Sequence, residues 1–192
     1  CARAGVRYLT VFAFSTENWN RSADEVASLM DLFVEFFERF DPELADAGVR
    51  VRFCGDLDAL PQRILEVIRT SERTSRGRNG MQLVVAFNYG SRRELAHAAR
   101  EIARDVAEGR LRPDEVDEGT LSGHLYLPDV PDPDLLIRPS GEYRLSNFLL
   151  WQAAYSELWF SDVLWPDFSE RDLQEAFASY SKRNRRFGGA ES

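Results

Sequence analysis

The sequence predicts an α/β domain in which a mostly parallel central sheet is flanked by helices. Segments rich in β-branched and aromatic residues alternate with amphipathic stretches long enough for helices, which is the order of βαβ units. Several apolar segments show no polar alternation, as expected of strands that are covered on both faces. The chain has 192 residues, of which 44% are apolar, so one domain with a substantial core is expected over residues 1–192.

The first half of the chain should supply two strands and two helices. We expect strands at residues 6–14 and 49–55 because both segments are dominated by β-branched and aromatic side chains. Between them, Ser22 is followed three residues later by Glu25, which is the pattern of a helix capping box. A second helix is expected from residue 61 to about residue 78, because its proline suits the first turn. The first of these helices carries apolar residues at helical spacing: Val26, Leu29, Met30, Phe33, Phe36, Phe37 and Phe40.

The second half should begin with a strand at residues 81–90. Ser91 and Glu94 then form a second apparent capping box, which predicts a helix to about residue 108. A short helix is expected over residues 114–126, a strand at about 134–138, and a further strand within 153–168. Ser169 and Asp172 resemble a helix start, and the final helix should run to about residue 186.

Composition excludes several classes of protein. The net charge of −8 argues against a general nucleic-acid binder, because phosphate backbones recruit basic surfaces. Without a signal-peptide pattern, a membrane-length apolar run or a cysteine framework, the cytoplasm is the expected location. Lys182 is the only lysine, so a site that needs cations must use arginine, which suits bidentate phosphate contacts.

In parallel sheets, ligands bind beyond the carboxyl ends of the strands, so the segments that follow the strands are the candidate sites. After the first strand, a polar loop would explain the hydroxyl, acidic and amide residues but not Trp19. After the third strand, residues 88–93 are best interpreted as an ordinary turn and helix start. The loop after the first strand contains the candidate residues Ser15, Thr16, Glu17, Asn18, Trp19 and Arg21.

The segment after the fourth strand predicts an anion site. Gly141 permits a turn with positive φ, so Arg138 and Arg144 could fold back toward one anion, joined by Ser146 and by N–H groups of the turn. The alternative is that both arginines form surface salt bridges, which is the commoner case. Glu157 is either a simple turn residue or a ligand of Mg²⁺. Apolar residues follow at once, so a substrate with a phosphate head and a hydrocarbon tail would fit.

Four segments together resemble the undecaprenyl diphosphate synthase family, the cis-prenyltransferases. They are LTVFAFSTENWNRS, NYGSRREL, LLIRPSGEYRLSNFLLWQAAYSELWFSDVLWPDF and RNRRFGG, and they cover almost the whole chain in the family's order. The resemblance implies a homodimeric, Mg²⁺-dependent α/β enzyme with a hydrophobic tunnel. Such an enzyme adds isopentenyl diphosphate in cis geometry to an allylic diphosphate, and its polyprenyl diphosphate product is a precursor of a glycan lipid carrier. Peripheral membrane contact would accompany product release.

The resemblance also assigns roles to residues. Ser15, Thr16, Glu17, Trp19 and Arg21 would lie in the substrate-binding loop, with Asn18 at the reacting carbons. The diphosphate of isopentenyl diphosphate would be held by Arg138, Arg144, Leu145 and Ser146, and Glu157 would help to bind Mg²⁺. Arg186 and Gly188 would reach the partner's phosphates across the dimer. The helix that carries Phe33, Phe36, Phe37 and Phe40 would partly line the tunnel, although plain core packing is expected for some of these rings. Ala13 matches a position where a small residue leaves the tunnel open.

The reaction implied is an electrophilic alkylation in which the allylic C–O bond ionises and a proton is finally lost. A neutral amide is a very poor base, so we expect the departing diphosphate to take that proton while Asn18 orients it or the substrate.

One departure from the family pattern bears on activity. The family begins with a strand and a phosphate-binding loop of the form His-x-x-Asp-Gly-Asn-x-Arg, and nothing in residues 1–192 matches it. Either that segment lies outside this sequence, or the chain is a non-catalytic subunit of the same fold that binds a partner chain. An unrelated nucleotide-binding protein is a third possibility, but the sequence has no glycine-rich phosphate fingerprint. Pro139 also replaces the usual threonine beside the anion site, which removes an N–H group.

Overall fold

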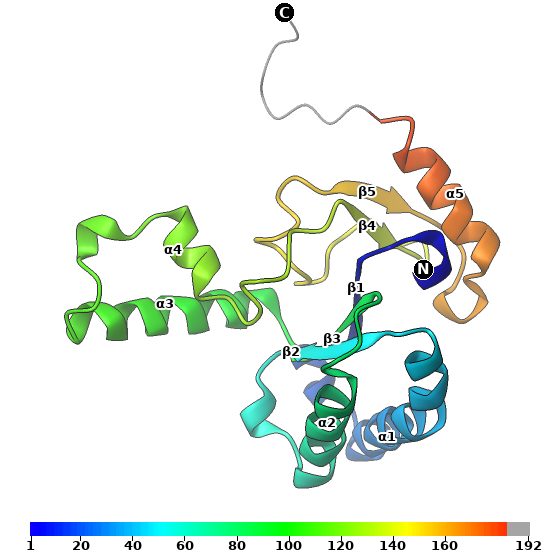
Figure 1. The fold of residues 1–192 in the computed structure, drawn as a ribbon, viewed down its shortest axis with the longest axis horizontal. Helices are drawn as coiled ribbons and strands as arrows, with labels where there is room; N and C mark the ends of the chain where they lie inside the picture. The colour runs from blue at the N-terminus through cyan, green and yellow to red at the C-terminus, as the bar shows by residue number, and fades with distance from the viewer. Residues whose placement is uncertain (184–192) are drawn as a thin grey trace, which may run out of the picture. The chain divides into compact units, whose positions relative to one another are not determined.

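The computed structural model describes residues 1–183, which form two compact units, Cys1–Val130 and a second unit that begins at Pro131. The first unit contains β1 (Tyr8–Ser15), α1 (Ala23–Asp46), β2 (Arg50–Cys54), α2 (Gln62–Ser75), β3 (Gln82–Tyr89), α3 (Ser91–Ala107) and α4 (Glu118–Gly123). The second unit contains β4 (Leu135–Arg138), β5 (Glu157–Phe160) and α5 (Glu170–Tyr180). All five expected strands are present (Figure 1).

Both sheets are parallel, as the sequence predicted. In the first unit β3 lies between β1 and β2, and in the second unit β4 pairs with β5. The pairing of β1 with β3 shifts its register between Phe12 and Phe14 and again between Phe14 and Ser15. Such an irregularity re-aims side chains at the end of a strand, and here it comes directly before the loop that holds the first group of candidate residues.

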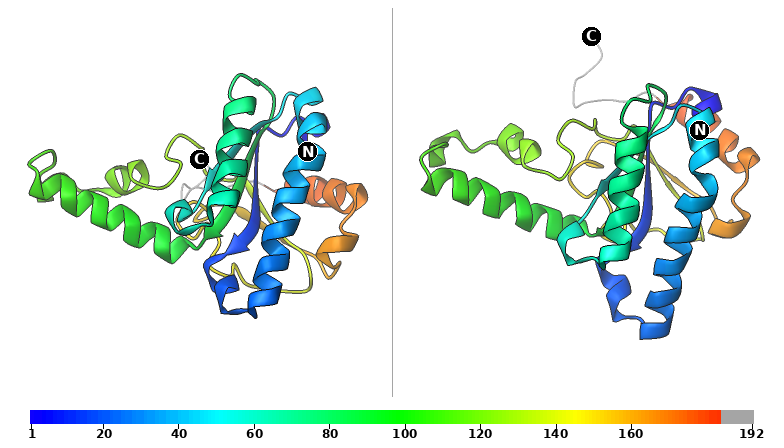
Figure 2. Two further views of the ribbon diagram at one scale, coloured as in Figure 1. Left: turned by 90° about the horizontal axis from the view of Figure 1, so that it is seen from below. Right: turned by 60° about the horizontal axis from the view of Figure 1, so that its bottom comes forward.

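The core of the first unit lies between its sheet and the pair α1 and α2. Figures 1 and 2 show these two helices side by side on one side of the sheet. Phe33 and Phe37 of α1 are 7% and 5% exposed and pack in this core, as expected for some of the phenylalanines. Phe36 is 44% exposed, and Phe40 is half-buried with its ring close to that of Phe36.

The capping box at the start of α1 is confirmed, but the one expected at the start of α3 is wrong. The Glu25 N–H donates to Ser22 Oγ at 3.3 Å, and the Ser22 N–H donates to Glu25 Oε2 at 3.2 Å. In α3, Gly90 is the N-cap residue, and the Glu94 carboxylate is directed elsewhere. It is 2% exposed and accepts hydrogen bonds from the Tyr89 hydroxyl at 2.6 Å and the Tyr126 N–H at 3.1 Å. Burial and this carboxylate raise the pKa of Tyr89, so its hydroxyl stays protonated and remains a donor.

Two further helix predictions need correction. The segment expected as one helix over residues 114–126 divides into a 3-10 turn, Pro113–Glu115, and the separate α4. Asp117 starts this new helix, because its carboxylate accepts the Thr120 N–H at 2.7 Å. The final helix begins after the Ser169 cap as expected but ends at Tyr180, short of residue 186. At this end the Ser181 hydroxyl bonds the Ala178 carbonyl, and such local bonds compete with helix continuation.

Candidate functional site

The loop after β1 is a single 3-10 turn, Thr16–Asn20, which begins directly after the strand. The Ser15 N–H donates to Asn18 Oδ1 at 2.7 Å, so the Asn18 side chain folds over its own turn. Thr16 Oγ1 donates to Glu17 Oε2 at 3.0 Å. The structure therefore places four of the six candidates on this turn, and the other two, Ser15 and Arg21, are the residues that flank it.

Trp19 is held at this strand end by a residue that the sequence interpretation missed. Its indole N–H donates to Asn88 Oδ1 at 2.8 Å, and its ring meets the edge of Phe14 with 5.2 Å between centroids. The ring remains 40% exposed. Asn88 lies in β3 and is the first residue of the segment 88–93, which the sequence analysis interpreted as an ordinary turn and helix start. Its position at the carboxyl end of a parallel strand was the signal that could have identified it.

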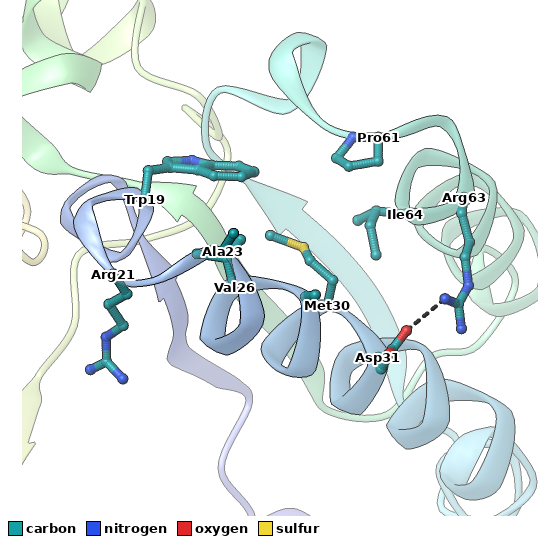
Figure 3. A pocket seen from close by; sticks show the side chains of 10 residues that line it. Trp19, Arg21, Ala23, Val26, Met30, Asp31, Pro61, Arg63 and Ile64 are labelled. Carbon is teal, nitrogen blue, oxygen red and sulfur yellow. Dashed lines mark hydrogen bonds and ion pairs between the residues drawn. The ribbon is translucent and has the colours of Figure 1, made fainter.

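A pocket of about 540 Å³ lies beside this loop, between the turn, α1 and α2 (Figure 3). Trp19 and Arg21 lie at one end, and apolar side chains, Met30 and Ile64 among them, form its walls. The Arg63 guanidinium pairs with Asp31 at 2.6 Å on the opposite side. Met30 of α1 and Ile64 of α2 line the pocket and also belong to the core, whereas Phe33 and Phe37 belong to the core without lining the pocket.

In the second unit, Arg138 and Ser146 come together as the sequence predicted. Arg138 ends β4, and its Nη2 donates to Ser146 Oγ at 3.5 Å. Arg138 Nε is buried and has no hydrogen-bond partner within residues 1–183. A buried donor without an acceptor costs about 1–3 kcal/mol, so this guanidinium is suited to an anionic ligand that supplies the missing acceptor.

The turn between these residues has the expected left-handed backbone. Ser140 has φ 76°, Gly141 has φ 64°, and Ser146 has φ 50°. Two of its N–H groups, those of Ser140 and Gly141, are already bound to backbone carbonyls. The Ser140 N–H donates to the Val163 carbonyl at 2.8 Å and the Gly141 N–H to the Ser161 carbonyl at 2.9 Å, so backbone pairing occupies both donors.

Arg144 follows the alternative that the sequence left open. Its side chain is 64% exposed and forms an ion pair with Glu142, two residues earlier. Leu145 is half-buried, and its carbonyl accepts the Phe148 N–H at 3.1 Å. The structure therefore brings Arg138 and Ser146 together as a candidate anion site, whereas the Arg144 side chain is exposed and paired with Glu142.

Glu157 begins β5 and is paired with a cation that the sequence interpretation did not single out. Arg183 Nη1 donates to Glu157 Oε2 at 2.6 Å and to the Leu158 carbonyl at 2.9 Å. Within residues 1–183, no group of three or more His, Cys, Asp or Glu side chains is placed to hold a metal ion. Glu157 therefore offers a single carboxylate. That donor set fits Mg²⁺, which is often bound by one or two carboxylates plus substrate phosphate oxygens.

The remaining candidates concern the chain end, the cysteines and membrane contact. Arg186 and Gly188 lie outside the described residues. Cys1 and Cys54 are free thiols, and burial raises the pKa of Cys54, which keeps its thiol protonated. Within the described part of the chain, every helix is too short or too polar to cross a bilayer.

Comparison with known proteins identifies the family. A family model described as putative undecaprenyl diphosphate synthase matches residues 1–188. The chain is 53% identical over 185 residues to the isoprenyl transferase of Thermotoga maritima, covering 96% of this chain and 78% of the relative. It is 51% identical over 185 residues to isoprenyl transferase 2 of Bradyrhizobium diazoefficiens, covering 96% of this chain and 73% of that protein.

Among solved structures, lavandulyl diphosphate synthase from Lavandula x intermedia in complex with dimethylallyl diphosphate is similar, with a TM-score of 0.94 and 41% identity. The match covers 98% of this chain and 81% of that one. The sequence motifs, the parallel strands and these matches agree, and the chain belongs to the undecaprenyl diphosphate synthase family of cis-prenyltransferases.

Proposed function

We propose that this chain condenses isopentenyl diphosphate with an allylic prenyl diphosphate in cis geometry and makes a polyprenyl diphosphate, the precursor of a glycan lipid carrier. The observation that carries the proposal is the buried Arg138 Nε, which has no acceptor within residues 1–183 and lies beside Ser146, in a chain of this family. The relatives are named as transferases, which favours a catalytic chain over the alternative of a non-catalytic subunit.

In this proposal Arg138 and Ser146 bind the diphosphate of isopentenyl diphosphate, with Arg144 and Leu145 at its edge. A guanidinium that presents two parallel N–H groups holds a phosphate in a fixed orientation. Arg138 reaches Ser146 through Nη2, and its Nε has no partner within residues 1–183, so a phosphate oxygen there would satisfy this buried donor. Arg144 can join by exchanging Glu142 for the ligand, since an exposed ion pair is weak.

The turn after β1 serves as the substrate-binding loop, with Ser15, Thr16, Glu17, Trp19 and Arg21 as contacts. The allylic C–O bond breaks, the double bond of isopentenyl diphosphate forms the new C–C bond, and the resulting cation loses a proton. The departing diphosphate takes that proton. Asn18 orients the reactants, and its amide oxygen is already engaged by the Ser15 N–H, which fits an orienting role better than that of a base.

Glu157 is the proposed protein ligand for Mg²⁺. The ion would neutralise charge on the diphosphate groups as the allylic bond breaks. Arg183 holds the Glu157 carboxylate at 2.6 Å, so this ion pair must open or share the carboxylate when the metal binds.

Membership of the family supports an inference about the domain and its assembly. We infer that residues 1–192 form one catalytic domain, because a single family model spans both compact units. The chain forms a homodimer in which Arg186 and Gly188 reach the partner's phosphates. Product release brings the protein into peripheral contact with a membrane.

The test of this proposal is substitution of Arg138 in the full-length gene product. Arg138→Gln, which removes the charge but keeps polarity, should reduce incorporation of labelled isopentenyl diphosphate by about 100-fold or more. Arg138→Lys keeps the charge but loses the fork, so it should restore only part of that activity. The control is Arg171→Gln, because Arg171 is 86% exposed on α5 and pairs with Glu175. Wild-type turnover by Arg138→Gln would refute the assignment.

A further inference from the structure

Asn88 occupies an unusual conformation at the carboxyl end of β3. Its φ is 48°, in the left-handed region, and its side chain is 1% exposed. Non-glycine residues seldom adopt this conformation, although asparagine does so more readily than most. A residue that keeps such a backbone while fully buried must be held there by its surroundings.

The side-chain amide of Asn88 links two loops that are far apart in the sequence. Its Nδ2 donates to the Asp56 carbonyl at 2.6 Å, while its Oδ1 accepts the Trp19 indole N–H at 2.8 Å. The Asp56 N–H donates in return to the Asn88 carbonyl at 3.1 Å. One residue at the end of β3 therefore joins the loop after β1 to the loop after β2. A primary amide is suited to this task because it carries a donor and an acceptor on one planar group.

The backbone around Asn88 leaves little room for rearrangement. A side chain on Gly55, just before Asp56, would place its Cβ 1.9 Å from the Phe87 carbonyl oxygen. The loop after β2 is thus pressed against the end of β3, and the Asn88 amide cannot turn away without losing both hydrogen bonds. Trp19, by contrast, is 40% exposed, and its other ring contact here is the edge of Phe14. The hydrogen bond to Asn88 is what fixes the orientation of the indole.

The orientation of the indole decides the shape of the neighbouring pocket. In Figure 3 the Trp19 ring lies over one end of the pocket, near Pro61 and Met30. Rotation of the ring would open or fill that end.

We propose that Asn88 is a positioning residue for the condensation: it holds the Trp19 indole so that the loop after β1 meets the allylic substrate in one preset arrangement. This inference rests on the proposed role of Trp19 in substrate binding. Because a net hydrogen bond contributes about 1 kcal/mol, its loss should raise KM for the allylic diphosphate about fivefold while changing kcat less.

The experiment uses a double-mutant cycle in the full-length protein. Asn88→Gly deletes the amide and tolerates the left-handed backbone, while Trp19→Phe keeps an aromatic ring and deletes the N–H. Kinetics with isopentenyl diphosphate and farnesyl diphosphate give KM and kcat for the single and double variants. NMR follows solvent exchange of the Trp19 indole N–H, whose resonance is assigned by its absence in Trp19→Phe.

We expect Trp19→Phe and Asn88→Gly to raise KM for farnesyl diphosphate about equally, and the double variant to add nothing further. The indole N–H should exchange faster in Asn88→Gly. Asn88→Asp keeps the acceptor for the indole N–H but loses the donor to the Asp56 carbonyl, so it should recover only part of the slow exchange and of the lost affinity. It provides the comparison if Asn88→Gly does not fold. The control Arg93→Gln removes the other side-chain contact to Asp56, a 2.9 Å ion pair, and should leave Trp19 exchange and KM unchanged.

Two outcomes would overturn the inference, and they differ from failure of the proposed function. Slow indole exchange in Asn88→Gly, or additive effects on KM, would show that Asn88 does not act through Trp19. If Trp19→Phe alone leaves KM unchanged, the role of Trp19 in substrate binding fails instead, and with it the need for a positioning residue.

Discussion

At the scale of single residues, Asn18 provides the clearest test of the chemistry. Its amide oxygen accepts the Ser15 N–H at 2.7 Å, and an aspartate could keep that bond. If Asn18 were the base, Asn18→Asp would be faster, because a carboxylate is a far stronger base than an amide. We expect the opposite: a carboxylate beside diphosphate groups repels them, so Asn18→Asp and Asn18→Ala should both be at least about tenfold slower. Steady-state product formation measures both rates.

The control for the Asn18→Asp variant is its thermal stability, which shows whether it is folded. Its melting temperature should stay close to that of the wild type, because the bond to the Ser15 N–H is retained. A variant that melts normally and turns over faster than the wild type would return Asn18 to the role of proton acceptor.

The residues that sequence reasoning identified and missed differ in a simple way. Arg138 and Ser146 are eight positions apart, and Gly141 between them indicates a turn that brings the chain back. Asn88 and Trp19 are 69 positions apart, and Arg183 and Glu157 are 26 apart. Pairs of the second kind depend on tertiary packing, which local patterns do not encode.

At the scale of elements, continuous apolar runs predicted the strands correctly, because such runs are typical of parallel strands that are buried on both faces. Helix starts were less reliable. The Ser22 pattern gave a capping box, whereas the same pattern at Ser91 did not, because the Glu94 carboxylate is drawn inward by Tyr89 and Tyr126. A capping motif competes with any buried donor near it, and the sequence cannot show which partner wins.

The contact between α3 and α4 should make stability depend on pH. Both ring nitrogens of His124 face acceptors: Nδ1 lies 2.7 Å from the Thr120 carbonyl and Nε2 lies 2.9 Å from Asp105 Oδ2. The Thr120 bond, then the Asp105 bond, raises the pKa of His124, with Glu101 adding a smaller effect. The pKa of Asp105 is lowered, first by its hydrogen bond with His124 and then by its hydrogen bond with Arg110. The Asp105 carboxylate therefore stays charged at neutral pH.

The raised pKa of His124 fixes the sign of this effect. Stabilisation is fully present below the unfolded pKa of about 6.5 and is lost as the pH rises through the folded value. Relative to His124→Gln, the wild type should therefore lose about 1–2 °C of melting temperature between pH 6 and pH 9, a small change because the pair is partly exposed. Thermal unfolding of both proteins across that range measures the difference. A constant gap, or an NMR titration midpoint of His124 at or below about 6.5, would contradict the assignment.

At the scale of the whole molecule, the sequence predicted the fold class, the parallel strands and the family, because these depend on patterns repeated along the chain. It could not predict the pairing around the candidate anion site. The Ser140 and Gly141 N–H groups are bound to the Val163 and Ser161 carbonyls, and Arg144 is paired with Glu142. The two backbone bonds arise where one segment meets another, which is information that a one-dimensional pattern lacks. The Arg144 pair is local and was one of the alternatives that the sequence left open.

The overall charge makes a prediction about membrane contact. With 32 acidic and 24 basic residues, the chain carries a net charge of −8, so anionic headgroups should repel it as a whole. Contact that serves product release should then depend on apolar surface. We expect sedimentation with phosphatidylcholine vesicles to be at least as strong as with phosphatidylserine vesicles, and salt to narrow the difference by screening the repulsion. Stronger binding to phosphatidylserine that salt abolishes would show instead that a local cluster of arginines, and not the net charge, governs the approach to the membrane.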